Sequence, residues 1–335
     1  MYSLEAVPLP PVPVVPAVHI IIVNWNSEAL LRRCLDALSG QTYSDFAVTV
    51  VDNGSAHFDA DALSAYFAER SRNPLSCLPL PRNEGFAAAN NHAVAALGDA
   101  TWIALLNPDA FPEPAWLERL LTAARERPDC ASFASRLIQA NAPDRLDGAG
   151  DAYHVSGLVW RRGHGEPAAG RYLAREEVFS ACAAAALYRG DALRAAGGFD
   201  DAFGSYVEDV DLGFRLRLAG HRCLYVPDAV AHHVGSAVSG PRSDAVVYLG
   251  HRNLVWCYAK NMPGVLAWVL LPAHLAMTLV AFTAYLVQGR GRVLWRAKRD
   301  AWRGLGDVLR RRRAVQATRR VRLRDLWPAF TKRLS

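Results

Sequence analysis

The chain has 335 residues, of which 51% are hydrophobic and 21% are charged, and its formal net charge is +6. This composition lies on the apolar side of ordinary globular proteins, and the length allows a full hydrophobic core in one large domain or two smaller ones. The six cysteines are scattered, with no CxxC pair and no zinc-like spacing, and together with the length they indicate a reduced cytoplasmic protein with buried thiols.

The positive charge is concentrated at the C-terminal end of the chain. Residues 288–335 contain 16 Lys and Arg against 3 Asp and Glu, a net charge of +13, so the remaining 287 residues carry −7. The basic character therefore belongs to a tail, which we place at 290–335. At the other end, residues 1–17 are Pro-rich and lack the basic start of a signal peptide, and we expect a flexible leader there.

The first third of the chain alternates short apolar runs with helical patterns. We expect strands at 19–23, 46–51, 75–80 and 101–106, and helices over 28–38, from near 85 onward, and over 113–126. Such alternation predicts an α/β fold with a mostly parallel sheet that helices cover on both faces.

Polar residues follow three of these strands, at 24–27 (NWNS), 51–55 (VDNGS) and 107–110 (NPDA). Pro108 has no N–H for a strand ladder, so the strand should stop there and leave Asp109 just beyond its end. Ligands of parallel α/β sheets bind outside the carboxyl ends of the strands, so we expect the three loops to share one site. The alternatives are that Asp52 is only a turn former and that Asp109 caps the following helix.

The segment 82–91 (RNEGFAAANN) is rich in small residues. Gly and Ala let a backbone approach a ligand closely, and a helix N-terminus here would favour a diphosphate. The alternative is a small-residue helix packed tightly on the sheet. Since no GxGxxG follows the first strand and no GxxxxGK[ST] occurs anywhere, a dinucleotide or P-loop site is not expected.

The middle of the chain, residues 136–178, predicts loops and short strands. A helix is predicted over 207–218, because Val210, Phe214 and Leu218 recur at helical spacing before Gly220. Acidic residues fill its first turn, where one carboxylate can face a cleft as a base. We expect Asp211 to form a surface ion pair with Arg215.

Five motifs in a fixed order then carry a resemblance. VNWNS (23–27), VDNGS (51–55), RNEGFAAANN (82–91), LLNPDA (105–110) and GGFDDAFGSYVEDVDLGFRLRLAG (197–220) resemble family 2 glycosyltransferases, in particular the bacterial rhamnosyltransferase-like branch that builds O-antigen and related glycans. The resemblance covers about residues 18–310, since RNLVWCYAKNMPG (252–264) is also similar to that branch. It implies the GT-A fold, with a domain at 18–260.

The resemblance also implies roles for individual residues. Asp209 would be the catalytic base, with Glu208 beside it, and Asp109 and His233 would bind Mg²⁺ or Mn²⁺. Asp52 would contact the base of a nucleotide-sugar, and Asn107 stands where many members have another Asp. We expect the nucleotide-sugar to be bound by Asn24, Asn26, Asp52, Asn53, Arg82, Asn83, Gly85, Phe86, Asn90 and Asn107.

These roles imply an inverting transfer, with dTDP-L-rhamnose favoured as donor and UDP-hexoses or GDP-sugars left open. The expected acceptor is a lipid-linked or cell-surface glycan.

A hydrophobic segment at 261–289 contains no Asp, Glu, Lys or Arg, and 265–287 is long enough to span a bilayer. A single crossing would separate the basic tail from the nucleotide-sugar, although both belong on the cytoplasmic side. Pro272 suggests a break, so we predict a re-entrant or in-plane hairpin at the cytoplasmic face of the inner membrane, with 290–305 on anionic headgroups. The alternative is a buried helix of the soluble domain.

Other functional classes fit the sequence less well. The run RRRR at 310–313 could bind nucleic acid, but no binding module accompanies it and the body of the chain is acidic. We therefore expect no nucleic-acid partner. A non-catalytic carbohydrate-binding relative is disfavoured because both Asp109 and Asp209 are present, and a nucleotidyltransferase because its Gly-rich signature is missing.

Overall fold

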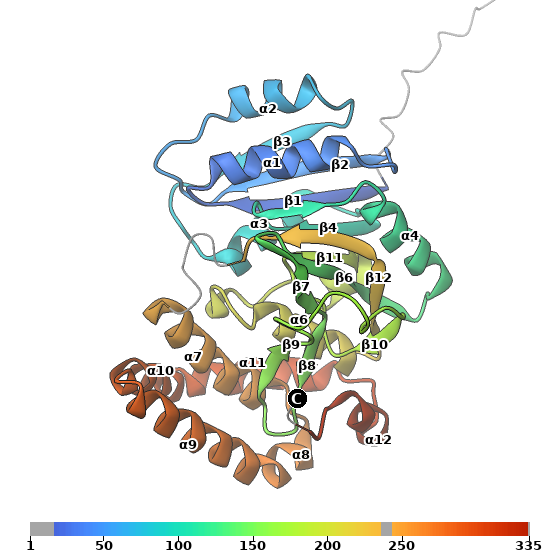
Figure 1. Ribbon diagram of the computed structural model, residues 1–335. Coiled ribbons are helices and arrows are strands. Elements are labelled where there is room, and N and C mark those ends of the chain that lie inside the picture. Colours follow the sequence, from blue (N-terminus) through green and yellow to red (C-terminus); the bar gives the residue numbers. More distant parts are fainter. Residues whose placement is uncertain (1–16, 236–242, 334–335) are drawn as a thin grey trace, which may run out of the picture.

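In a computed structural model of the protein, residues 17–235 and 243–333 are described, so the predicted leader lies outside them except for Ala17. Their main feature is a ten-stranded sheet whose continuous strand order is β10-β12-β6-β11-β4-β1-β2-β3 (Figure 1). The strands are β1 (Val18–Asn24), β2 (Phe46–Asp52), β3 (Leu75–Pro79), β4 (Trp102–Leu106), β5 (Ala110–Pro112), β6 (Cys130–Gln139), β7 (Ala142–Ala149), β10 (Glu176–Val178), β11 (Ala185–Arg189) and β12 (Arg222–His233).

The sheet is parallel where the sequence alternates strands with helices. β3, β2, β1 and β4 all run in the same direction, and every residue of β1 is buried because helices cover both faces. The covering helices are α1 (Glu28–Ser39), α2 (Ala60–Ala68), α3 (Phe86–Ala96), α4 (Trp116–Glu126) and α5 (Gly190–Ala195). The sequence analysis missed α2. This helix is short, is capped by the Asp59 side chain, and buries only Leu63 and Phe67, so its apolar pattern is brief.

Beyond β4 the sheet becomes mixed, and here the prediction of loops and short strands for 136–178 was partly wrong. β11 is antiparallel to both β4 and β6, and β6 continues to Gln139 and forms a hairpin with β7. β6 is almost wholly buried between β11 and β12, so pairing on both sides outweighs its weak local pattern. A separate two-stranded sheet, β8 (Asp151–Tyr153) and β9 (Val159–Arg161), follows β7.

The remaining helices gather below the sheet in Figure 1. They are α6 (Glu208–Leu218), α7 (Asp244–Asn261), α8 (Gly264–Val269), α9 (Leu271–Val287), α10 (Gly291–Arg303), α11 (Leu305–Ala317) and α12 (Leu323–Leu326). α10 and α11 pack on α7, and α7 packs on α6. One apolar cluster joins them to the β8–β9 hairpin and contains Tyr153, Phe179, Phe214, Trp256 and Phe330.

The ion pair predicted on the surface of α6 is instead buried. Asp211 accepts hydrogen bonds from Arg215, Lys260 and Asn261, and its side chain is fully inaccessible to solvent. The reason is that this face of α6 packs directly against α7.

The hydrophobic run forms two helices, α8 and α9, with a break at Leu270 just before Pro272. The alternative of a buried helix is wrong, because His274 is the one buried residue of α9. Within the described residues, no helix combines the length and apolarity that a membrane crossing requires.

Candidate active site

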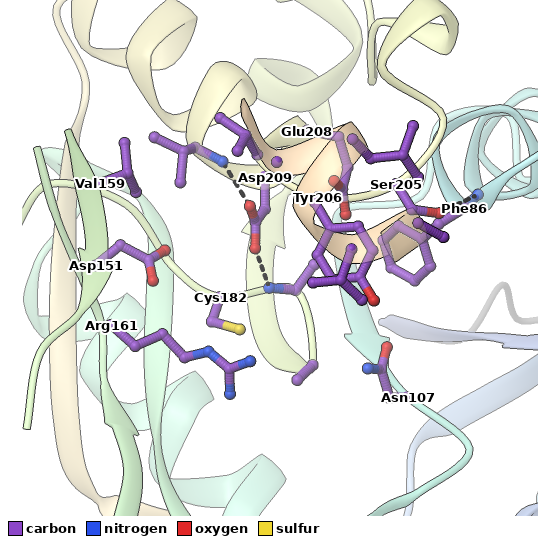
Figure 2. A pocket seen from close by; sticks show the side chains of 18 of the residues that line it. Phe86, Asn107, Asp151, Val159, Arg161, Cys182, Ser205, Tyr206, Glu208 and Asp209 are labelled. Carbon is purple, nitrogen blue, oxygen red and sulfur yellow. Dashed lines mark hydrogen bonds between the residues drawn. The ribbon is translucent and has the colours of Figure 1, made fainter. Parts of the chain in front are cut away.

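A cavity of about 700 Å³ opens at the carboxyl edge of the parallel strands. The loops after β1, β2 and β4 form one wall, and the start of α6 with the loop before it forms another. The β8–β9 hairpin and α7 close the remaining sides (Figure 2). Asp109, Glu208, Asp209 and His233 all line this one cavity.

The loop after β1 is tied to the loop after β2 by buried hydrogen bonds around Asp52. Its carboxylate accepts hydrogen bonds from Asn24 Nδ2 (2.9 Å), Ser55 Oγ (2.6 Å) and the Ser55 backbone N–H (3.0 Å). Asn26, in a left-handed conformation, accepts a hydrogen bond from the backbone N–H of Ala56 (2.9 Å). Asn24, Asn26 and Asp52 thus shape the edge of the sheet but do not line the cavity.

Four other predicted donor-binding residues do line the cavity: Asn53, Asn83, Phe86 and Asn107. Asn53 links its loop to the next, since it donates to Asn83 Oδ1 (3.2 Å) and accepts from the Glu84 N–H (2.9 Å). The predicted Arg82 has an 82% exposed side chain outside the cavity. Asn90 is buried and donates to the Phe86 carbonyl within α3.

The first two N–H groups of α3 are bonded within the protein, against the expectation that the start of 82–91 offers them to a diphosphate. Phe86 N–H donates to Ser205 Oγ (3.4 Å) and Ala87 N–H to the Gly204 carbonyl (2.8 Å), so the first helical donors are already used. Gly85 has φ of +89°, and a Cβ there would lie 2.9 Å from the Gly204 Cα. Glycine at position 85 therefore allows the backbones of Gly85 and Gly204 to approach closely.

Asp109 and His233 form a pair at the end of β4 and β12. Asp109 does not cap α4, which begins at Trp116 after Ala115. His233 Nε2 lies 3.4 Å from an Asp109 oxygen, and its Nδ1 lies 2.7 Å from Asp147 Oδ2. Burial opposes protonation of the imidazole, but the hydrogen bonds with both carboxylates outweigh it and raise the pKa of His233 to about 9.

The neighbouring His232 points to the other face of β12. Its Nε2 lies 3.0 Å from Glu113 Oε1, and the His232 side chain is far more exposed than that of His233. Successive side chains of a strand face opposite sides, so His233 alone of the two reaches the cavity.

The donor set of Asp109 and His233 fits a divalent cation. A carboxylate oxygen and an imidazole nitrogen converge on the cavity, and imidazole with carboxylate suits Mn²⁺ while Mg²⁺ also accepts one or two carboxylates beside phosphate oxygens. The described residues contain no group of three or more metal-ligating side chains. A cation held here would therefore need further ligands from a bound phosphate.

The catalytic candidates lie at the start of α6, after two residues with left-handed backbones. Tyr206 and Val207 have φ of +70° and +68°, an uncommon conformation for such side chains. Asn253 of α7, fully buried, holds this loop by donating to the carbonyls of Phe203 (2.9 Å), Ser205 (3.0 Å) and Tyr206 (2.7 Å).

Asp209 is fixed by backbone donors on both of its oxygens. Val210 N–H donates to Oδ1 (2.8 Å) and Ala183 N–H to Oδ2 (3.1 Å), as the dashed lines of Figure 2 show. Burial nevertheless raises the pKa of Asp209 above that of an ordinary Asp. A carboxylate held rigidly and with a raised pKa is suited to accept a proton near neutral pH.

Glu208 lies beside Asp209 and is buried. Its Oε2 has no hydrogen-bond partner within the part of the chain that the structure describes, and burial and the charge of Asp209 together raise the pKa of Glu208. An unpartnered oxygen on the cavity wall is a position for a hydroxyl donor of a bound ligand.

The sequence analysis missed four functional candidates: Asp147, Asp151, Arg161 and Asn253. Asp147 is buried, and hydrogen bonds from His164 and His233 hold its pKa well below its usual range although burial alone would raise it. Asp151 and Arg161 are register partners in the β8–β9 hairpin and line the cavity. No motif marks them, because only the folded hairpin brings them to the site.

Comparisons with known proteins agree on one family. Residues 19–195 match the family model described as glycosyl transferase family 2. The N-acetylglucosaminyl-diphospho-decaprenol L-rhamnosyltransferase of Mycobacterium tuberculosis is 28% identical over 287 residues, which cover 75% of this chain and 88% of that protein.

Solved structures show the same architecture. A mannosyltransferase of Pyrobaculum calidifontis, in complex with GDP-Man and Mn²⁺, has a TM-score of 0.52 at 18% identity and covers 91% of this chain and 88% of that one. GalNAc-T7 with UDP, GalNAc and Mn²⁺ has a TM-score of 0.59 at 12% identity, covering 74% and 48%. The fold is therefore the GT-A-like α/β fold that the sequence predicted.

Proposed function

Because the chain belongs to glycosyl transferase family 2, we propose that it transfers a sugar, with inversion, from a nucleotide-sugar to a lipid-linked acceptor. The observation that carries the proposal is that Asp109 and Asp209 line the same cavity at the carboxyl edge of the sheet. Asp109 could then hold a cation beside the leaving diphosphate, and Asp209 could take the proton of the attacking hydroxyl.

The mechanism follows from the position of Asp209. Its carboxylate takes the proton of an acceptor hydroxyl, the hydroxyl oxygen attacks the anomeric carbon, and the bond to the nucleoside diphosphate breaks on the opposite face of the sugar. The two backbone N–H donors hold the carboxylate in place, so little reorganisation is needed at the moment of transfer. The Glu208 oxygen to which no described residue donates is placed to orient the acceptor hydroxyl.

Asp109 and His233 would hold Mg²⁺ or Mn²⁺, with Asp147 orienting the imidazole from behind. When bound, the cation would offset the negative charge that develops on the leaving diphosphate. Asn53, Asn83, Phe86 and Asn107 supply polar groups and an aromatic ring for the nucleotide and the sugar.

The donor we favour is dTDP-L-rhamnose, and UDP-hexoses or GDP-sugars are the alternatives. The M. tuberculosis relative is named for L-rhamnosyl transfer to an acceptor with a decaprenyl diphosphate, which supports this choice. A screen of dTDP-, UDP- and GDP-sugars for metal-dependent thermal stabilisation tests it, since a ligand that binds only the folded state raises Tm. Turnover of the stabilising donor should then depend on Asp209, and a protein that no nucleotide-sugar stabilises would refute the proposal.

We place the enzyme at the cytoplasmic face of the inner membrane, held by α8, α9 and α10. α8 and α9 expose large apolar side chains, among them Trp268 (76% exposed), Leu279 (66%) and Val280 (70%). α10 exposes a stripe at heptad spacing that comprises Arg292, Trp295, Arg296, Arg299, Trp302 and Arg303. Its opposite face, with Leu294, Ala297 and Ala301, is buried.

An anionic bilayer matches the chemistry of this surface. Tryptophan favours the headgroup level, arginine pairs with anionic phosphates, and the apolar side chains can enter the upper acyl region. α9 packs against α10, so the apolar and the basic elements are neighbours. Helices that lie in the plane of the membrane need no crossing, and the lipid-linked acceptor would then be supplied from the same surface.

A further inference from the structure

We infer that Arg161, on the β8–β9 hairpin, is a binding residue for the oxyanion of a diphosphate in the active-site cavity. The inference deepens the proposed function and rests on it, because it names the part of a substrate that this side chain would hold. No motif marks Arg161, and its role is derived from the charges and contacts of the cavity.

The described wall of the cavity offers few positive charges to an anionic ligand. Four carboxylates line the cavity, and among the described lining residues Arg161 is the single Lys or Arg. The carboxylates are Asp109, Asp151, Glu208 and Asp209. A nucleotide-sugar and a lipid diphosphate are both polyanions, and among the described lining residues Arg161 and the imidazole of His233 are the groups that can offer them a positive charge. A divalent cation at Asp109 would serve one side, and Arg161 serves the hairpin side.

Arg161 is held rigidly but is not fully used by the protein. One guanidinium nitrogen donates to Asp147 Oδ2, and among the described residues Asp147 is its one hydrogen-bond partner. The side chain is 33% exposed and reaches into the cavity below Asp209 (Figure 2). An arginine offers five donors in a fixed planar fork, so the remaining N–H groups can bind two oxygens of a phosphate.

The surroundings of Arg161 also favour a defined position. Its backbone pairs with Asp151 across the hairpin, and the stem of its side chain lies against Gly148. A Cβ at Gly148 would be 3.2 Å from Arg161 Cδ, so the glycine leaves the space that the arginine fills. The same Asp147 oxygen is hydrogen-bonded to His233 Nδ1. One buried carboxylate therefore connects Arg161 to the candidate metal ligands.

The diphosphate that Arg161 binds can come from the donor or from the acceptor. Calorimetric titrations of the full chain, in chelator and in Mn²⁺, distinguish the two: dTDP, UDP and GDP represent the donor, and farnesyl diphosphate represents the acceptor. The variants are Arg161→Gln and Arg161→Lys. Arg162→Gln is the matched control, because Arg162 pairs with Glu176 and does not line the cavity.

We expect Arg161→Gln to weaken one class of diphosphate by about ten- to hundredfold, the loss that a charge-assisted hydrogen bond predicts. Arg161→Lys should restore part of this loss, since it keeps the charge without the fork. The corresponding nucleoside monophosphates should bind with unchanged affinity, and Arg162→Gln should match the wild type. A loss confined to nucleotides assigns the site to the donor, and a loss confined to farnesyl diphosphate assigns it to the acceptor.

Unchanged affinity for both diphosphates in Arg161→Gln, with Tm near that of the wild type, would show that Arg161 only neutralises Asp147 and would overturn the inference alone. If Arg161→Gln does not fold, equal binding by Arg161→Lys and the wild type overturns it, and weaker binding by Arg161→Lys supports it. A wild-type protein that binds neither diphosphate would instead overturn the proposed function together with this inference.

Discussion

Lys260 Nζ lies 2.8 Å from a carboxylate oxygen of Asp211, in the buried contact between α7 and α6. Asp200 is also bound to the same ammonium at 2.6 Å, and Arg215 donates to Asp211 at 2.9 Å. Burial alone would raise the pKa of Asp211, but the charges of Lys260 and Arg215 lower it. The charge network thus connects the helix that begins with Glu208 and Asp209 to α7, on which α10 and α11 pack.

Asp211→Asn should destabilise the protein by about 3–5 kcal/mol, because it leaves Lys260 and Arg215 without their shared buried partner. Chemical denaturation would measure the change. Glu28→Gln is the control, since it removes an exposed pair with Arg32 and should cost less than about 0.5 kcal/mol. Equal stability of the two variants would mean that the buried network contributes nothing specific.

Asp209→Asn should lower kcat by about 10²–10⁴-fold and leave donor affinity within a few-fold of the wild type. The amide keeps the shape of the side chain but cannot take a proton from the acceptor. Steady-state kinetics with parallel titration of the donor would separate the two effects. Asp228→Asn changes an exposed carboxyl outside the cavity and should have no effect on either; substantial turnover in Asp209→Asn would remove Asp209 from the role of base.

The pH dependence of kcat/KM should show an acid limb that belongs to Asp209. Burial raises the pKa of this carboxyl, so protonation begins at a higher pH than for an ordinary Asp, whose value is about 3.9. As pH falls through the raised pKa the base is lost, and kcat/KM should decline about tenfold per pH unit. A limb at or below the ordinary Asp value would contradict the assignment.

Removal of the divalent cation should weaken binding of the donor nucleotide, and Asp109→Asn and His233→Ala should reduce the metal-dependent part of that binding. We expect about ten- to hundredfold weaker affinity in the presence of Mn²⁺ and little difference in chelator. His232→Ala is the matched control, because His232 lies next in the chain but pairs with Glu113 outside the cavity. A His232→Ala variant as impaired as His233→Ala would argue against the proposed ligand set.

Membrane binding should depend on the exposed stripe of α10. Two double variants should each weaken binding to vesicles rich in anionic lipid by about tenfold or more: Trp295→Ser with Trp302→Ser, and Arg292→Gln with Arg299→Gln. For the second variant, the expected loss follows from about 1 kcal/mol per arginine at an anionic surface. Co-sedimentation at two salt concentrations would measure it. Arg119→Gln on α4 is the control for a lost exposed charge, and wild-type binding by both double variants would exclude this surface.

The regular part of the fold could be predicted because its local signals are strong. The apolar run of β1 and the Pro108 break after β4 specify strands whose ends carry polar loops, and neighbouring parallel strands bring those loops together. β6 and β7 were not predicted as a long hairpin because β6 is stabilised by pairing with β11 and β12, which are distant in sequence, and β7 pairs with β6 alone.

The site was only partly accessible to sequence reasoning for the same physical reason. Asp109 and Asp209 lie within recognisable segments, so the roles that we propose for them could be expected from the sequence. The contacts of Asp147 with Arg161 and His233 exist only after β7 and β9 have folded against the sheet edge. The sequence could not show that Gly204 and Ser205, over a hundred residues later, bond the first two N–H groups of α3.

Through Asn253, the C-terminal helices support the loop that precedes the candidate catalytic residues. The side-chain amide of Asn253 donates to the carbonyls of Phe203, Ser205 and Tyr206, in the segment that leads into Asp209, and α7, which carries Asn253, packs against α10 and α11. Truncation before α7 would remove these three hydrogen bonds, and the segment that leads into Asp209, the proposed base, would lose their support. The surface that we propose for membrane binding and the residue that we propose as base therefore belong to one set of packed helices.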